Sequence, residues 1–176
     1  MFIHRTFSLA VLITGLSLFP GCSVVPTQAA KQQFHLGDRA PAGQITYMGL
    51  SAEYRDQIPG AKEPLKDRYL VMRLSATNGG AQEVTLPLTR LIAADGKEYP
   101  EVTEVEGFPE WLGPLRRIEP GKTEQGYIVF DVPVGAYKLE VSGGGDLEQE
   151  QLVQIDVPAN LTPIAPSSVP GPVLGN

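Results

Sequence analysis

Few side chains in this sequence could transfer a proton or hold a metal ion. The chain has two histidines and one cysteine. His4 lies in a short basic and apolar leader, so His35 is the histidine that a processed protein would keep. A serine, histidine and aspartate triad would have to use His35, and a zinc site would have one histidine and no structural cysteine. We therefore interpret His35 as a surface or edge-strand residue and expect a protein without enzymatic activity or a cofactor.

A second set of polar side chains is the run of glutamates in residues 101–110, EVTEVEGFPE. Carboxylate oxygens are the ligands that calcium prefers, which makes Glu101, Glu104 and Glu106 the candidates for a metal site. Their spacing does not match an EF-hand loop. We interpret the run as a solvated acidic loop without a metal. A small-ligand or cation-binding protein that uses this loop is the alternative function.

Residues 108–117, FPEWLGPLRR, combine the single tryptophan with a phenylalanine and two adjacent arginines. Tryptophan and arginine often anchor recognition surfaces. The candidate interaction surface therefore consists of Phe108, Trp111, Arg116 and Arg117. The other interpretation is that the segment packs against the domain as a cover, because leucines flank the tryptophan and β-sandwiches usually bury one.

The single cysteine follows a secretory leader. Residues 1–5 are short and basic, and the thirteen residues 7–19 (FSLAVLITGLSLF) carry no charge, as in a signal peptide. They are too few to cross a membrane, which takes about 20 apolar residues. The sequence Leu18-Phe19-Pro20-Gly21-Cys22 resembles a bacterial lipobox, in which the cysteine is acylated. We predict a lipoprotein signal peptide over residues 1–21 and a membrane anchor at Cys22, because two or more acyl chains give stable attachment.

The leader also suggests where the protein resides. Ser23 after the cysteine resembles the default for delivery to the outer membrane in bacteria with two membranes. Cleavage after Ala29 would instead release a soluble secreted form. The net charge of −6 argues against a nucleic-acid partner, because phosphate binding needs clustered Lys and Arg. We expect a lipid-anchored protein of the cell envelope that contacts an envelope protein or polymer.

The elements that must position these residues are strands. Residues 69–77 and 83–89 each alternate apolar and polar side chains, as half-buried strands do. The turn signal Asn78-Gly79-Gly80 lies between them. A hairpin with a three-residue loop would pair Leu74 with Val84 on the apolar face. The alternative is that the chain crosses here from one sheet to another.

Further strands are bounded by turn residues, among them Asp95-Gly96 and Pro120-Gly121. They are expected at residues 44–53, 97–102, 126–132, 137–142 and 153–157. About seven strands predict an all-β, immunoglobulin-like antiparallel β-sandwich over residues 34–158. A flexible tether over residues 22–33 precedes it, and a Pro-rich tail over residues 159–176, expected to be disordered, follows it.

The order and spacing of these motifs resemble the family called domain of unknown function 4352. The matching motifs are DRYLVMRL at 67–74 with Asn78, DGKEY at 95–99, Pro120-Gly121 and FDVP at 130–133. The resemblance covers about residues 34–158 and implies the immunoglobulin-like sandwich of secreted and lipid-anchored bacterial proteins. It implies no catalytic or ligand-binding residue, because the family has none agreed.

Overall fold

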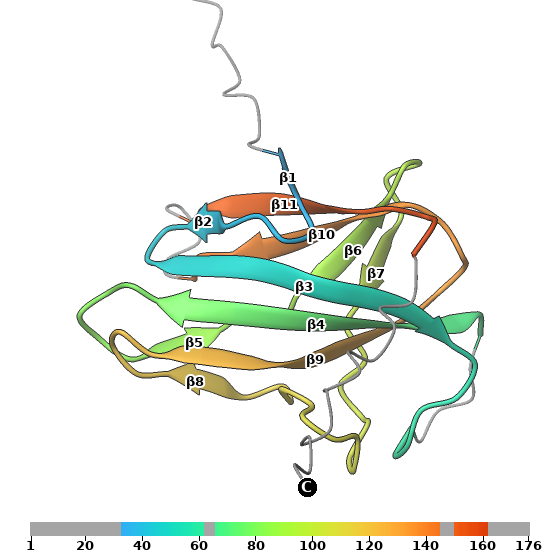
Figure 1. Cartoon of the computed structure of the whole chain (residues 1–176), viewed down its shortest axis with the longest axis horizontal. Helices are drawn as coiled ribbons and strands as arrows, with labels where there is room; N and C mark the ends of the chain where they lie inside the picture. Colours follow the sequence, from blue (N-terminus) through green and yellow to red (C-terminus); the bar gives the residue numbers. More distant parts are fainter. Residues whose placement is uncertain (1–32, 62–65, 145–149, 162–176) are drawn as a thin grey trace, which may run out of the picture. The chain divides into compact units, whose positions relative to one another are not determined.

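The computed structural model describes residues 33–61, 66–144 and 150–161, and within them the chain forms strands and no helix (Figure 1). The strands are β1 (Gln33–His35), β2 (Ala40–Ala42), β3 (Ile45–Arg55), β4 (Arg68–Asn78), β5 (Val84–Leu86), β6 (Arg90–Ala93), β7 (Glu98–Pro100), β8 (Arg116–Ile118), β9 (Thr123–Val132), β10 (Tyr137–Ser142) and β11 (Leu152–Val157). The predicted all-β class is confirmed. The described part contains more strands than predicted, because β1, β2, β6 and β8 have only three or four residues each.

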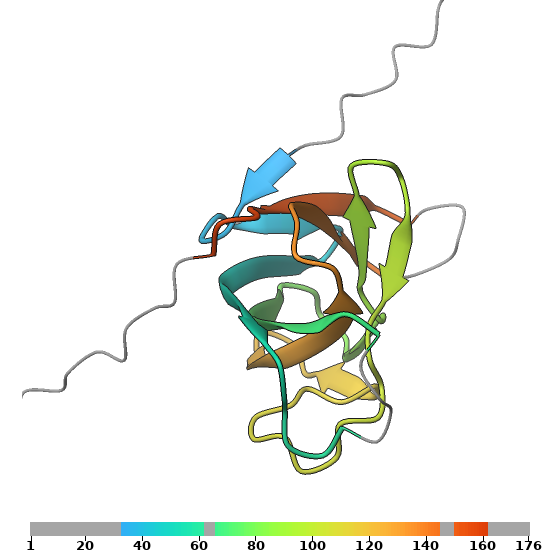
Figure 2. The same cartoon turned by 90° about the vertical axis from the view of Figure 1, so that its right-hand side faces the viewer.

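Two larger sheets and one small sheet make up the fold. The strand orders are β1-β11-β10-β6-β7, β2-β3-β4-β9 and β5-β8. Figure 2 shows the two larger sheets as layers that face each other. All pairings are antiparallel except that of β1 with β11, which is parallel. The predicted sandwich is therefore confirmed, with a parallel edge strand that the sequence pattern did not indicate.

The main core lies between the two larger sheets. Leu139 and Ile155 face it from the five-stranded sheet, and Leu70, Leu74 and Phe130 face it from the four-stranded sheet, all with 0% exposure. Each such side chain contributes roughly 1.5–3 kcal/mol by leaving water. The period-two alternation places these residues on the inner face, and residues between them, such as Arg73 and Lys138, on the outer face.

β4 is also buried on its outer face. Tyr69 and Val71 point away from the main core and, with Val129 of β9, form a second apolar cluster. Val105 and Phe108 cover this cluster from the segment between β7 and β8. That segment therefore packs as a cover over the four-stranded sheet.

The hairpin predicted between residues 69–77 and 83–89 is wrong. β4 pairs with β3 on one edge and with β9 on the other, so β5 pairs instead with β8, with Val84 opposite Ile118. The side-chain amide of the buried Asn78 donates hydrogen bonds to the carbonyls of Gln82 (2.7 Å) and Ile118 (2.9 Å). These bonds direct the chain out of β4, and the alternative of a crossing between sheets is confirmed.

The turns predicted at Asp95-Gly96 and Pro120-Gly121 are confirmed. Gly96 has a φ of 84° and donates its N–H to the carbonyl of Ala93 at 2.9 Å. Gly121 has a φ of 70°, and Lys122 donates to the carbonyl of Glu119 at 3.1 Å. A positive φ is the reason that glycine occupies each position.

Residues just outside the predicted domain, 34–158, also take part in the sandwich. β1 begins at Gln33, the last residue assigned to the tether, and Leu161, beyond residue 158, packs against the main core. The signal peptide, Cys22, Ser23, Ala29 and tail residues 162–176 lie outside the described residues.

Candidate functional site

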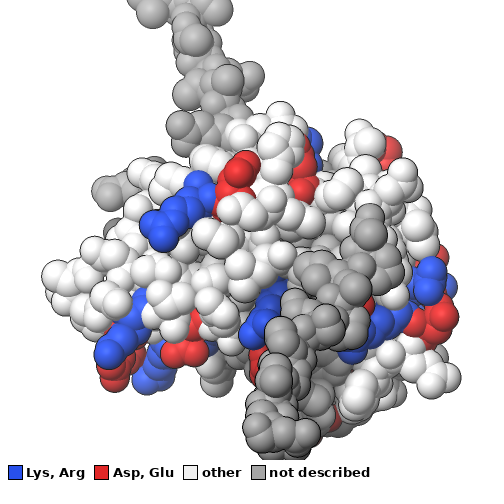
Figure 3. Space-filling view, viewed as in Figure 1, with Lys and Arg blue, Asp and Glu red and all other residues white. Residues whose placement is uncertain are grey.

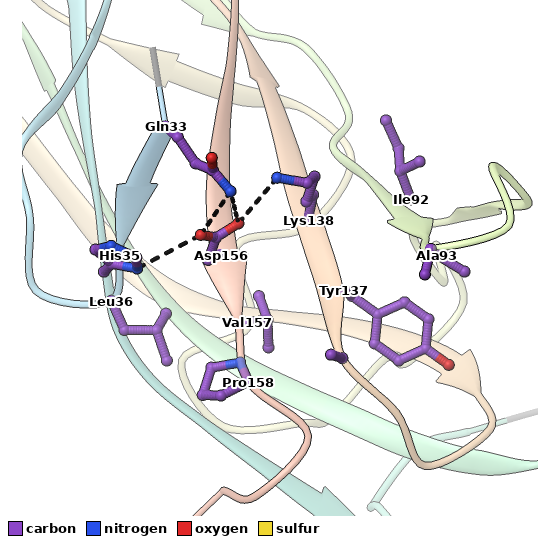
Figure 4. Close-up of a pocket in the computed structure, with 12 residues that line it drawn as sticks. Gln33, His35, Leu36, Ile92, Ala93, Tyr137, Lys138, Asp156, Val157 and Pro158 are labelled. Atoms are coloured by element: carbon purple, nitrogen blue, oxygen red, sulfur yellow. Dashed lines mark hydrogen bonds and ion pairs between the residues drawn. The ribbon is translucent and has the colours of Figure 1, made fainter. Parts of the chain in front are cut away.

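A groove of about 580 Å³ lies on the outer side of the five-stranded sheet (Figure 4). β1, β6, β10 and β11 contribute its lining, together with the residues that directly follow them or precede them. The lining residues are Gln33, His35, Leu36, Ile92, Ala93, Ala94, Ala136, Tyr137, Lys138, Asp156, Val157 and Pro158. Two thirds of these residues are apolar, and the volume falls in the range of small-molecule sites, roughly 300–1,000 Å³.

A polar cluster around Asp156 occupies one part of this groove. Both carboxylate oxygens of Asp156 accept from the Gln33 amide, at 3.0 and 2.9 Å, and one accepts from Lys138 Nζ at 3.2 Å. His35 Nδ1 lies 3.5 Å from the same carboxylate, and its side chain is 75% exposed. His35 therefore lies on an exposed edge strand, as predicted, and its contact with Asp156 helps to hold β1 against β11.

Opposing effects act on the pKa of the Asp156 carboxyl. Burial acts to raise this pKa, but the hydrogen bonds from Gln33 and Lys138 and the charge of Lys138 together lower it below its ordinary value of 3.8. A carboxyl with a lowered folded pKa stabilises the native state above its ordinary pKa, and that contribution is lost as the pH falls through the lowered value. The attachment of β1 should therefore be acid-sensitive.

We expect the β1 amides to report a titration below pH 3.8 that depends on Asp156. The titration is measured by the NMR amide shifts of Phe34 in β1 and of Lys138 in the neighbouring part of the sheet, β10, followed from pH 7 downward. Asp156→Asn should abolish this titration, whereas Asp95→Asn in the exposed β6–β7 turn should leave it intact. An unchanged titration in Asp156→Asn would show that the carboxylate does not hold β1.

The sequence analysis did not find this groove. β6 was not predicted, because its four residues RLIA show no alternation, and the partners of Asp156 lie on strands that are distant in sequence. Ile92 and Asp156 both lie opposite Lys138 of the strand between them, β10, a neighbourhood that no local pattern in the sequence indicates.

The candidate interaction surface of residues 108–117 does not form one exposed patch. Phe108 is 6% exposed and Arg116 is 3% exposed, so the prediction that they belong to a contact surface is wrong for both. Phe108 packs edge-on against Tyr127, with the ring centroids 5.5 Å apart. Trp111 is partly exposed and joins the edge of β9 beside Tyr127. The alternative that the segment packs as a cover describes these residues.

Two side chains at the end of this segment do face solvent. Leu115 is 86% exposed, and the Arg117 side chain is 74% exposed and lies 3.8 Å from Glu83. Arg117 keeps its place in the predicted surface. Leu115 is the most exposed large apolar side chain among the described residues, so it does not take part in the packing of this segment.

Glu101 is not part of a solvated loop. Its side chain is 1% exposed, forms an ion pair with Arg116 and accepts from Thr89 Oγ1 at 2.9 Å. Burial raises the pKa of the Glu101 carboxyl above its ordinary value, while the Arg116 guanidinium and the Thr89 hydrogen bonds offset part of that rise. The interpretation of Glu101 as a solvated carboxylate is wrong, because Arg116 and Thr89 occupy its oxygens.

The remaining acidic candidates differ from Glu101 in burial. Glu104 and Glu106 are exposed. Within residues 33–61, 66–144 and 150–161, no group of three or more His, Cys, Asp or Glu side chains is arranged to hold a metal ion. The same residues include no helix long and apolar enough to span a membrane.

Three solved structures share this fold. The yjhA protein from Bacillus subtilis matches with a TM-score of 0.55 and 17% identity, over 70% of this chain and 99% of that one. A putative lipoprotein (ycdA) from Bacillus subtilis matches with a TM-score of 0.55 and 16% identity, over 69% of this chain but only 39% of that one. The secreted protein MPT63 from Mycobacterium tuberculosis matches with a TM-score of 0.51 and 17% identity, over 72% and 98%. A comparison with curated proteins gave no match.

The fold and its structural neighbours define an antiparallel β-sandwich module. The family model described as domain of unknown function (DUF4352) matches residues 34–150. The chain belongs to this family, as its motifs indicated.

Proposed function

We propose that the chain is a lipid-anchored protein of the cell envelope whose β-sandwich is a non-enzymatic interaction module. The observation that carries the proposal is the distance between anchor and domain. β1 begins at Gln33, eleven residues after the acylation candidate Cys22, with ten residues between the two. Ten intervening residues reach at most about 35 Å when extended, so the sandwich would stay close to the membrane surface.

Two structural neighbours support an extracytoplasmic location. MPT63 is described as secreted, and ycdA is described as a putative lipoprotein. In a bacterium with two membranes, Ser23 after the cysteine favours the outer membrane. A soluble form cut after Ala29 is the competing outcome.

The paired ionisable groups support a role other than catalysis. Glu101 is held by Arg116, and Glu140, with a side chain that is 3% exposed, accepts from Arg90 Nε and Gln154 Nε2, each at 2.9 Å. On the face shown in Figure 3, the described acidic and basic side chains likewise lie beside each other in small groups. These charges stabilise the sandwich, and a contact surface has to come from exposed side chains.

Leu115 and Arg117 form the best-supported contact surface. They flank the buried Arg116 at the end of the cover segment, one apolar and one charged. Arginine is enriched in recognition surfaces, and Leu115 adds an exposed apolar side chain two positions away. The partner that fits is an envelope protein with an apolar pocket near an acidic group.

The anchor is tested by fractionation and mass spectrometry of the purified chain. The wild type should remain with the membrane in high salt and carry acyl mass on Cys22, whereas Cys22→Ala should appear in the soluble fraction. A wild-type chain that begins at Ala30 and carries no acyl group would contradict the anchor and establish the secreted form.

The contact surface is tested by cross-linking in cells. Leu115→Ser combined with Arg117→Glu should lower the yield of a specific cross-linked partner about tenfold, since loss of a hot-spot residue costs roughly 1–2 kcal/mol or more. Val134→Ser is the matched control, because Val134 is 57% exposed outside this surface. Equal cross-linking by both variants, with unchanged melting, would remove this surface from consideration.

A further inference from the structure

Part of the groove beside Asp156 is lined by apolar side chains against which a hydrocarbon chain could pack. Ile92, Ala94, Ala136 and Pro158 line it, and all four are partly or fully exposed although apolar. In Figure 4, Pro158, Tyr137 and Ala93 lie away from the polar cluster of Gln33, Asp156 and Lys138. An occupant with an apolar body and a polar end would match both parts.

The backbone beneath the groove offers little to a peptide. β10 is hydrogen-bonded to β11 on one side and to β6 on the other, so its N–H and C=O groups are used within the sheet. A polypeptide bound on this face would bury some of its own amide groups without hydrogen-bond partners. Each such group costs free energy. A hydrocarbon chain has no such groups, and its methylenes gain free energy by leaving water.

The polar end is electrically balanced. Lys138 and Asp156 form an ion pair at 3.2 Å, and the Asp156 oxygens also accept from Gln33. An ammonium has three N–H donors, and only one of them is used to reach Asp156. Lys138 and the exposed His35 can therefore offer hydrogen bonds to oxygen acceptors. Lys138 would repel a cationic head group, and Asp156 would repel an anionic one. An uncharged head group therefore fits best.

We propose that this groove binds a free, uncharged monoacyl ester, with its single hydrocarbon chain over Ile92 and Ala136 and its ester and hydroxyl oxygens at Lys138. The ligand class is that of a monoacylglycerol. The inference goes beyond the proposed anchor and contact surface and depends on neither, because every residue that it uses lies in the described sandwich.

The test is calorimetric titration of the processed chain carrying Cys22→Ala, so that no attached acyl chain competes. The probes are 1-monolaurin, laurate and dodecyltrimethylammonium, each below its micelle concentration. We expect monolaurin to bind about tenfold more tightly than either charged probe, a difference of about 1.4 kcal/mol. Asp156→Asn should narrow the gap between monolaurin and laurate, because it removes the repelling charge.

Two phenylalanine substitutions, one inside the groove and one outside it, form a matched pair of variants. Ala136→Phe should weaken monolaurin binding at least about tenfold without changing the melting temperature, because Ala136 is exposed. Val134→Phe is also at an exposed site but outside the groove lining. It should bind monolaurin as tightly as the chain without either phenylalanine. Absence of binding, equal binding by the two variants, or displacement of monolaurin by a synthetic peptide of residues 162–176 would overturn the proposal.

Discussion

Glu101→Ala is expected to lower the free energy of unfolding by about 3–5 kcal/mol, because it leaves the buried charge of Arg116 without its partner. The two side chains are 1% and 2% exposed. Glu101 also accepts from the Thr89 N–H and hydroxyl, at 3.2 and 2.9 Å, and these donors would lose their partner as well. Thermal and denaturant unfolding, followed by circular dichroism, measure the change.

Two further variants distinguish the effect of losing the buried ion pair from the effect of losing any glutamate side chain. Glu98→Ala is the exposed control, with a side chain 55% exposed and 3.6 Å from Arg90, and should cost at most about 1 kcal/mol. Glu101→Leu with Arg116→Met should be less destabilised than Glu101→Ala, because it leaves no buried charge. A double variant that is as unstable as Glu101→Ala would show that packing at Glu101, rather than its charge, carries the effect.

Gly126→Ala is expected to destabilise the protein by about 2–3 kcal/mol and to loosen the cover segment. A Cβ at Gly126 would lie 2.4 Å from the Glu110 carbonyl oxygen and 2.8 Å from Leu112 Cγ. The Glu110 carbonyl accepts from the Tyr127 N–H at 2.8 Å, and Leu112 donates to Tyr127 at 3.0 Å. Moving Glu110 would break the bonds that attach the segment to the edge of β9.

The fluorescence of Trp111 reports this change directly, because it is the single tryptophan of the chain. Its emission should shift to longer wavelength in Gly126→Ala as the ring becomes more exposed. Gly135→Ala is the matched control, since its Cβ would lie 3.5 Å from the Tyr137 hydroxyl oxygen and 3.6 Å from the nearest ring atom, which are ordinary contacts. A stable Gly126→Ala protein with unchanged emission would show that the segment accommodates a side chain there.

Local signals in the sequence were enough to predict strands such as β10 and the turns at Asp95-Gly96 and Pro120-Gly121. Alternation shows which face of a strand is buried, and glycine shows where φ must be positive. The same signals gave the wrong partner for β5, because alternation along a strand does not say which edge of which sheet accepts it.

The candidate sites show the same limit. Arg116 and Arg117 are adjacent and identical in type, yet Arg116 is buried against Glu101 and Arg117 is exposed. Consecutive side chains of a strand point to opposite faces, and β8 was not predicted, so nothing local distinguished the two arginines. The groove was missed for the same reason, since its lining comes from four strands.

The sequence by itself determined the all-β class, the family and the turns, because these depend on residue periodicity and on backbone preferences that act within a few residues. Only the tertiary structure decided which polar side chains are paired in the interior and which remain exposed. Glu101 pairs with Arg116 in the interior, and Gln33 pairs with Asp156 at the surface, across 123 positions of the chain. Such contacts follow from how the sheets pack and which strands become neighbours. A buried charge such as that of Arg116 destabilises the fold unless a partner of opposite charge lies beside it.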